Sequence, residues 1–237
     1  TDSDCIPSPN WIRLAVAHLR PGVGVVCGSV RPLPIGADDP FFLHQIHPIE
    51  REDGLYATAN VFYLRAAFLS LGGFQEDMRT YSWGQPVGGD DTDLAWRIKR
   101  ASYQSAFADD AFVYHQATPI SMRSYLMQTA AAQVLPQLVA RFPELRSSCL
   151  YRRYFLHGQS AAFYPFVAGL ALAKVTPWSL LLTTPWLKAA WPALKMDVWP
   201  PRRWPRAAAR LVLEVESSTL LAAALIRGSI RNRSVVL

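Results

Sequence analysis

The stretch from Gly88 to Arg97, Gly-Gly-Asp-Asp-Thr-Asp-Leu-Ala-Trp-Arg, constrains the fold of this chain more than any other segment. Two consecutive glycines allow a sharp turn and a close approach of the backbone to a ligand. Asp90 and Asp91 then stand at the start of a helix, where the positive end of the helix dipole favours carboxylates. The residues after them form one apolar helical face, so a rigid element would hold these acids. The alternative is a structural helix cap, which is a common use of acidic residues at this position.

A second acidic pair, Asp2 and Asp4, stands at the beginning of the sequence. On an extended segment, side chains two residues apart point to the same side, which suits shared binding of a hard divalent cation. An Asp-x-Asp pair by itself is typical of a solvated turn. The pattern becomes more specific when it is combined with the Asp90-Asp91 helix start and with an apolar strand that ends in His115.

In the order of these segments, the first half of the chain resembles the family-2 glycosyltransferases, whose catalytic domain has the GT-A fold. The matching segments are Asp2–Pro7, Gly28–Val30, Ala59–Arg65, Gly72–Glu76, Asp90–Arg97 and Val113–His115. The family has Glu-Asp where this chain has Asp90-Asp91, so the charge and the second acid are kept. No Gln-x-x-Arg-Trp motif follows the acidic helix, so the resemblance does not extend to processive cellulose- or chitin-type synthases.

The resemblance implies transfer of a sugar from a nucleotide-sugar donor to an acceptor hydroxyl, with inversion of the anomeric centre. It implies that Asp4, helped by Asp2, holds Mg²⁺ or Mn²⁺ at the donor diphosphate, and that Asp91 is the general base. His115 would be a further metal ligand or diphosphate contact, and an imidazole suits Mn²⁺ better than Mg²⁺. The remaining candidates are Asn60 at the donor, and Asp90, Gly89 and Trp83 at the acceptor.

Two further observations have structural alternatives of equal or greater weight. Trp83 offers an indole ring on which a sugar can stack, but it can equally pack beneath the loop. His44 and His47 are three residues apart on an expected short helix, Phe41–Glu50, yet no third ligand is near them in sequence. We therefore expect the two histidines to have a structural or solvent-facing role.

The start of the sequence departs from the family pattern. A nucleotide-binding βαβ half normally precedes the Asp-x-Asp strand, whereas this sequence begins at Thr1, on the motif itself. We therefore expect the chain to be a fragment that lacks the nucleotide-binding half and is inactive alone.

Charge is distributed unevenly along the 237 residues, of which 51% are hydrophobic. Nine Lys and Arg stand against fourteen Asp and Glu through residue 118, and fifteen stand against four from residue 119, in agreement with the net charge of +6. The basic residues alternate with aliphatic and tryptophan-rich runs, which favours a membrane over nucleic acid as the partner of this half. Three cysteines without CxxC spacing favour reduced thiols and the cytoplasmic face.

Two uncharged runs, Ser160–Ala173 and Val175–Leu187, follow in the basic half. Neither reaches the ~20 residues needed to span a bilayer, so a re-entrant hairpin, an interfacial helix pair and one kinked span remain open. Five tryptophans fit an interfacial aromatic belt, namely Trp178, Trp186, Trp191, Trp199 and Trp204. The alternative is an apolar helical subdomain docked on a soluble partner. A last helix is expected over Ala207–Arg227, ended by Gly228.

Hydrophobic periodicity and Gly and Pro positions predict the elements of the acidic half. Helices are expected at Asn10–Leu19, Arg65–Leu71 and Asp91–Ala101, and strands at Val23–Val30, Ala57–Leu64 and Ser105–His115. The strand Ala57–Leu64 is apolar enough to be central in the sheet. Asp109 and Asp110 interrupt the last strand as a turn or bulge, and Ser121 can cap the next helix.

The sequence thus predicts an α/β fold, the C-terminal part of a GT-A domain over residues 1–118. A basic amphipathic linker over residues 119–157 and an apolar, membrane-associated helical region over residues 158–237 follow it. The expected partners are a nucleotide-sugar, a lipid-linked or glycan acceptor and a membrane, with no nucleic acid. Two other classes stay open: a non-catalytic membrane-docking module that keeps the fold, and a metal-dependent phosphohydrolase with water as the nucleophile.

Overall fold

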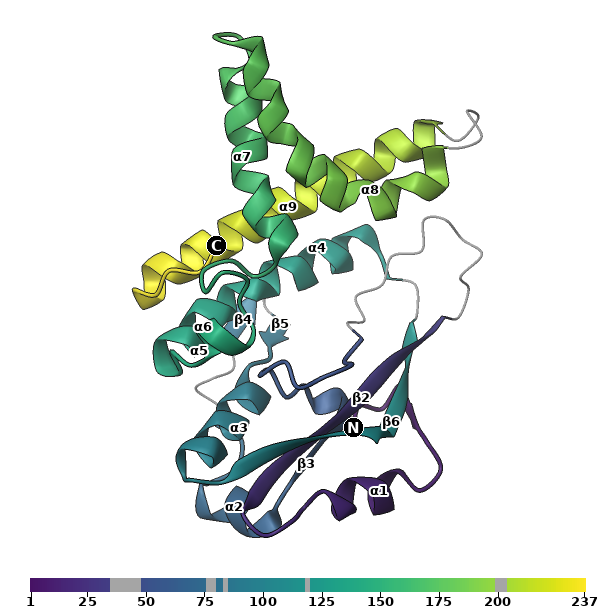
Figure 1. Cartoon of the computed structure of the whole chain (residues 1–237), viewed down its shortest axis with the longest axis vertical. Coiled ribbons are helices and arrows are strands. Elements are labelled where there is room, and N and C mark those ends of the chain that lie inside the picture. The colour runs from purple at the N-terminus through teal and green to yellow at the C-terminus, as the bar shows by residue number, and fades with distance from the viewer. Residues whose placement is uncertain (35–47, 76–79, 83–84, 118–119, 199–203) are drawn as a thin grey trace. The chain divides into compact units, whose positions relative to one another are not determined.

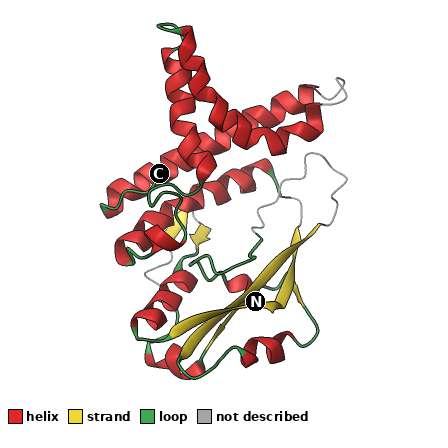
Figure 2. Cartoon of the chain, viewed as in Figure 1, coloured by secondary structure: helices red, strands yellow, loops and turns green. Residues whose placement is uncertain are grey.

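The computed structural model describes residues 1–34, 48–75, 80–82, 85–117, 120–198 and 204–237. The chain divides into two compact units, Thr1–Gln128 and Thr129–Leu237 (Figure 1). The described strands belong to the first unit, and the second unit is helical (Figure 2). Trp83, His44, His47 and Trp199 lie outside the described residues, as does most of the helix expected at 41–50.

The first unit is built on a four-stranded mixed sheet in the order β1-β6-β2-β3. Its strands are β1 (Cys5–Pro7), β2 (Val23–Pro34), β3 (Val61–Tyr63) and β6 (Gln104–Ala117). The two long inner strands, β2 and β6, run parallel, whereas β1 and β3 pair antiparallel with β6 and β2. A separate hairpin of β4 (Thr80–Ser82) and β5 (Gln85–Val87) precedes the acidic helix. The mixed α/β architecture expected from the sequence is confirmed.

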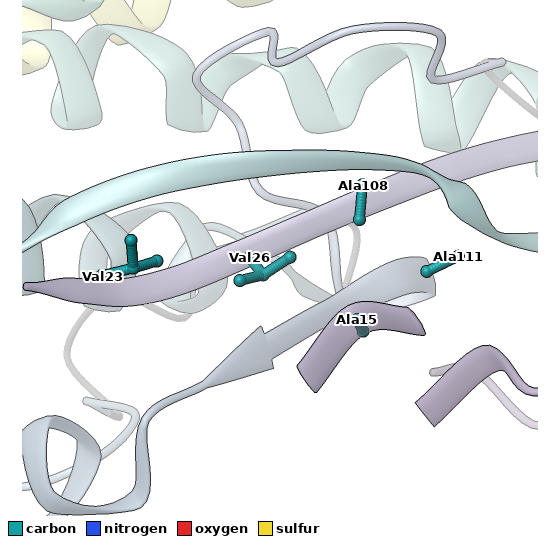
Figure 3. Packing of buried hydrophobic residues seen from close by; sticks show 5 residues of the cluster. All are labelled: Ala15, Val23, Val26, Ala108 and Ala111. Carbon is teal, nitrogen blue, oxygen red and sulfur yellow. The ribbon is translucent and has the colours of Figure 1, made fainter. Parts of the chain in front are cut away.

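Three helices, α1 (Trp11–Ala17), α2 (Arg65–Ser70) and α3 (Asp90–Arg100), accompany this sheet. Small side chains of β2 and β6 form a core with Ala15 of α1 (Figure 3); its members are Ala15, Val23, Val26, Ala108 and Ala111. Gly24 leaves room for α3, because a Cβ at this position would lie 2.6 Å from Cγ2 of Ile98. This close packing fixes the helix that carries Asp91 against the sheet.

The segment expected as a central strand at Ala57–Leu64 has a different structure. A 3₁₀ turn, η1 (Thr58–Asn60), occupies its first half, and β3 is only three residues long and last in the sheet order. The reason is the buried Asn60 side chain, whose Nδ2 donates to the carbonyls of Ser29 (2.9 Å) and Ala111 (2.8 Å). An amide that binds the two inner strands in this way turns the chain before it can join the ladder.

The expected interruption of the last strand at Asp109 and Asp110 is confirmed. The β2–β6 register steps from Gly28 opposite Ala108 to Val30 opposite Val113, so β6 bulges between these positions. The two acids remain exposed at the bulge, where Asp110 lies 3.3 Å from Nε2 of His18 and Asp109 lies 3.7 Å from Arg31.

Helix α4 (Met122–Ala130) crosses the division between the units and starts with the predicted cap, because Ser124 N donates to Ser121 Oγ at 3.1 Å. The second unit continues with short elements η3 (Ala131–Val134), α5 (Leu135–Arg141) and α6 (Leu145–Ser148). Its longer elements are α7 (Gly158–Leu172), η4 (Pro177–Thr183), α8 (Thr184–Val198) and α9 (Trp204–Asn232). Among the described helices, none combines the length and the apolar character that crossing a membrane requires.

Two predictions for the second unit are wrong. Helix α9 does not end at Gly228 but continues to Asn232. Gly228 is needed for packing instead, because a Cβ there would lie 2.5 Å from the carbonyl oxygen of Gln133. Trp186 does not belong to an interfacial belt, since it is completely buried with Phe163 and Phe166 in the core of the unit. Trp178, Trp191 and Trp204 are exposed, as a belt requires.

Candidate functional site

Four residues at the edge of the sheet bring potential metal ligands together. Antiparallel pairing of β1 with β6 sets Cys5 opposite His115, and Gln116 N donates to the carbonyl of Asp4 at 3.0 Å. One ligand atom from each of Asp2, Asp4, Cys5 and His115 lies within 4.8 Å of the others. His115 Nε2 is 3.7 Å from a carboxylate oxygen of both acids. The three predicted metal ligands are therefore neighbours in the structure.

The donor set of this cluster fits a divalent cation. Two carboxylates supply the oxygen ligands that Mg²⁺ and Mn²⁺ prefer, and an imidazole adds a nitrogen that Mn²⁺ accepts. The carboxylates of Asp2 and Asp4 are 40% and 47% exposed, so a diphosphate and water have access to the remaining positions. His115 Nδ1 is buried, and no residue in the described part of the chain bonds to it.

Cys5 is the member of the cluster that the sequence reasoning missed. Burial is the main cause that raises the pKa of its thiol, and the charges of Asp2 and Asp4 raise it further. The thiol is therefore neutral near pH 7, and the charged donors are the two acids. The signal that identifies Cys5 is strand pairing rather than spacing, because residue 5 is the one opposite His115.

The predicted base, Asp91, lies in the first turn of α3 after Gly89, whose φ of 138° requires glycine. Its Oδ1 accepts from Thr92 N at 2.7 Å, and its Oδ2 accepts from Thr58 N at 3.3 Å. Burial is the largest cause of a pKa raised to about 6, and the nearby charge of Asp90 raises it further. The side chain keeps partial access to solvent. A partly accessible carboxylate with this pKa is suited to accept a proton near neutral pH.

A polar cluster around Glu52 fixes the loop that contacts Asp91. Oε1 of Glu52 accepts from Ser105 Oγ at 2.7 Å, from Lys99 Nζ at 3.1 Å and from the hydroxyl of Tyr56. Burial raises the pKa of Glu52, but these three hydrogen bonds together hold it below its ordinary value. Tyr56 is buried and has a φ of 54°, an uncommon conformation for a bulky residue.

Further bonds attach the same loop, here named the strap (residues 52–58), to α3. Thr92 Oγ1 donates to the carbonyl of Leu55 at 2.6 Å, and Trp96 Nε1 donates to the carbonyl of Gly54 at 2.9 Å. The strap thus contacts α3 at its start and middle, and its last residue donates to Asp91. The sequence reasoning missed the strap, because its partners are distant in sequence.

Asn60 has a role that was not predicted. Besides its two bonds to β2 and β6, its Oδ1 accepts from Trp11 Nε1 at 2.9 Å, and the residue is 1% exposed. These contacts make Asn60 a structural link between α1 and the two inner strands. Its contact with the donor stays a prediction, as do the acceptor contacts of Asp90 and Gly89.

No protein-family model matches the sequence, and no curated protein matches it. A solved structure of the mannosyltransferase PcManGT from Pyrobaculum calidifontis, in complex with GDP-Man and Mn²⁺, is similar at 22% identity and a TM-score of 0.45. The similarity covers 98% of this chain and 61% of the length of that protein. A likeness this distant defines neither the fold family nor the activity of the chain.

Proposed function

We propose that this chain is part of an inverting glycosyltransferase of the family-2 type, with a GT-A catalytic domain that uses a nucleotide-sugar donor. The observation that carries the proposal is Asp91, a carboxylate at a glycine-initiated helix start whose pKa is raised to about 6. The cluster of Asp2, Asp4 and His115 at the edge of the sheet supports it, because an enzyme that moves a sugar off a diphosphate needs a counter-charge.

Each group has one task in the proposed reaction. Asp2, Asp4 and His115 would hold Mg²⁺ or Mn²⁺, which supplies charge to stabilise the leaving diphosphate. Asp91 removes the proton of the acceptor hydroxyl while the acceptor oxygen bonds to the anomeric carbon and the bond to the diphosphate oxygen breaks. The proton ends on Asp91, and the attack opposite the leaving group inverts the anomeric centre.

The inner strand β6 connects the proposed base, Asp91, with the metal cluster of Asp2, Asp4 and His115. The strap reaches Asp91 through Thr58, and Asn60, two residues later, bonds to Ala111 on β6. Ala111 and His115 lie four residues apart on that strand. Hydrogen bonds thus connect Asp91, on a helix packed against the sheet, to the strand that carries His115, which limits changes in the separation of base and diphosphate site, as a displacement between two bound substrates requires.

The proposal includes the context of the reaction. The donor would be a nucleotide-sugar, and the acceptor would be a lipid-linked or glycan hydroxyl. The basic and apolar half from residue 119 would place the catalytic unit on the cytoplasmic face of a membrane.

The test is sugar transfer by the protein from a panel of nucleotide-sugars with Mn²⁺, comparing Asp91→Asn with Asp109→Asn. Asp109 is a matched control because it is an exposed acid on the β6 bulge. We expect Asp91→Asn to lower kcat by about two orders of magnitude or more and Asp109→Asn to have little effect. In the unmodified protein, transfer should fall about tenfold per pH unit below the Asp91 pKa of about 6.

Three results would contradict the proposal. Near-normal transfer by Asp91→Asn would exclude Asp91 as the base. Hydrolysis of the donor or of a phosphoester without any sugar transfer would favour a phosphohydrolase. No donor binding and no turnover with any nucleotide-sugar would favour a non-catalytic module.

A further inference from the structure

The part of the second unit that projects farthest in Figure 1 is unusually apolar on its surface. Helix α7 and η4 lie side by side there and extend away from α9. We name residues Val167–Leu182 the apolar tip. Eight large apolar side chains of these sixteen residues are exposed: Val167, Leu170, Leu172, Val175, Trp178, Leu180, Leu181 and Leu182. Val175 and Trp178 are 80% and 79% exposed. Exposed apolar side chains gathered at this density along one segment indicate an interaction site.

Three hydroxyls in and just after η4 are bonded to carbonyls within the hairpin. Ser179 Oγ donates to the carbonyls of Gly169 (2.9 Å) and Thr176 (2.8 Å). Thr183 and Thr184 donate their hydroxyls to carbonyls three residues earlier, at 2.7 and 2.8 Å. Ser179 and Thr183 are buried, whereas Thr184 is exposed. Because these hydroxyls are already bonded, transfer of this part of the hairpin into lipid would leave none of the three without a partner.

Helix α7 and η4 pack closely enough to insert into lipid as one rigid unit. Gly169 on α7 faces η4, where a Cβ would lie 2.6 Å from the carbonyl oxygen of Ser179. Glycine therefore permits the two segments to touch along their backbones, as in helix pairs within lipid.

Charge on the hairpin indicates what it contacts. Lys174, in the turn of the apolar tip, is the only charged residue from Gly158 to Leu187. A lysine stem can lie along apolar groups while its ammonium reaches lipid phosphates. The absence of Asp and Glu from this stretch removes repulsion from an anionic leaflet.

We propose that the apolar tip inserts into one leaflet of an anionic lipid bilayer, to the boundary between headgroups and acyl chains, with Val175 and Trp178 as its anchors. The 15 residues of α7 extend about 22 Å, less than the ~30 Å hydrocarbon core, so insertion from one side fits its length. The sequence left open a re-entrant hairpin, an interfacial helix pair and one kinked span, and this proposal corresponds to the re-entrant hairpin. The inference deepens the membrane association of the proposed function and does not depend on sugar transfer.

The experiment is flotation of the full chain with vesicles of phosphatidylcholine alone and mixed with phosphatidylglycerol. We expect binding to the mixed vesicles, and at least about tenfold weaker binding for the double variant Val175→Ser, Trp178→Ser, because two large apolar side chains no longer enter lipid. Lys174→Glu should weaken binding to the anionic vesicles about fivefold or more. Ile12→Ser is the matched control, since Ile12 is 62% exposed on α1 outside the tip.

A second measurement reports insertion directly. Brominated acyl chains quench tryptophans that enter the bilayer, and Trp178→Phe should reduce this quenching while it preserves binding. Trp204→Phe should not reduce it, because Trp204 lies on α9 away from the tip.

Binding that is equal for the wild type and the tip double variant would overturn the proposal, as would quenching that survives Trp178→Phe. A dimer in vesicle-free solution that the double variant abolishes, with no vesicle binding, would assign the tip to a second copy of the chain. Sugar transfer plays no part in these readouts, so their failure would leave the catalytic proposal standing.

Discussion

The backbone N–H of Thr58 lies 3.3 Å from Oδ2 of Asp91, although the two residues are 33 positions apart in sequence. This contact, like the larger one from Thr92 N, lowers the pKa of a carboxylate whose burial raises it to about 6. The strap therefore contributes to the pKa of the proposed base from outside the helix that carries it. Its own position depends on Glu52, Tyr56 and Lys99.

The first prediction follows from the free-energy cost of burying the ionised carboxylate of Asp91. Because the folded-state pKa of about 6 exceeds the ordinary aspartate value of 3.8, the folded protein binds the proton more tightly. The free energy of unfolding should therefore fall as pH rises between these values, and stay lower above them. Asp91→Asn should remove this loss and be more stable than the wild type by on the order of 2 kcal/mol at pH 7. At pH 3 the difference should vanish, as urea unfolding at both pH values would show. A constant difference at all pH values would contradict this.

The second prediction concerns the strap. Tyr56→Phe removes a hydroxyl that donates to Glu52 and accepts from Lys99, so we expect a loss of about 1–2 kcal/mol of stability. It should also raise the pKa of Asp91, because a looser strap weakens the Thr58 bond. Carboxyl ¹³C NMR measures that pKa, and Asp91→Asn assigns the signal. Tyr103→Phe is the control, because Tyr103 packs against the cluster of Ala67, Leu94 and Ile98. An unchanged Asp91 pKa in Tyr56→Phe would show that the strap has no part in tuning it.

The third prediction concerns the metal cluster. Asp4→Ala and His115→Ala should each weaken Mn²⁺ binding, measured by calorimetry, by about tenfold or more, because each removes a ligand. His115→Ala should also reduce the preference for Mn²⁺ over Mg²⁺. Cys5→Ser should change Mn²⁺ affinity little, because the raised pKa of the thiol makes it a poor donor. Equal affinities for all four proteins would argue that the cluster binds no cation.

The fourth prediction separates two glycines of the second unit. Gly228→Ala should destabilise the unit by about 1–3 kcal/mol, because its Cβ would lie 2.5 Å from Gln133 O and 3.0 Å from Pro136 Cγ. Gly158→Ala, at the start of α7 with no atom within 4 Å of the added Cβ, should be neutral or stabilising. Thermal unfolding compares the two. Equal melting temperatures would mean that α9 can shift to accept the methyl group.

Local rules identified the parts of the fold that depend on neighbours in sequence. Glycines followed by acids gave the start of α3, Ser121 gave the cap of α4, and the two acids within an apolar strand gave the β6 bulge. Each of these features is decided within a few residues, by turn chemistry or by capping. The Asp-x-Asp pair and His115 could be joined only because their order resembles a known family.

Contacts between distant segments could not be predicted in this way. Cys5 joins the metal cluster through strand pairing, and Glu52 meets Ser105 across 53 positions. Gly228 fits the rule for a helix end, but its absence of a side chain serves a close helix contact. Trp186 fits a belt by composition, yet it fills the helical core. In each case tertiary packing overrides what the local pattern favours.

The bonds of Asn60 also have a consequence for folding kinetics. Its amide joins residues 31, 49 and 51 positions away, so all three bonds require large loops to close first. We infer that this junction forms after the rate-limiting step, when β2 and β6 are already paired. The Asn60 amide then stabilises the native state but not the transition state for folding. Its removal would speed unfolding more than it would slow refolding. A substitution of Asn60 would therefore shorten the lifetime of the folded first unit more than it would slow its formation.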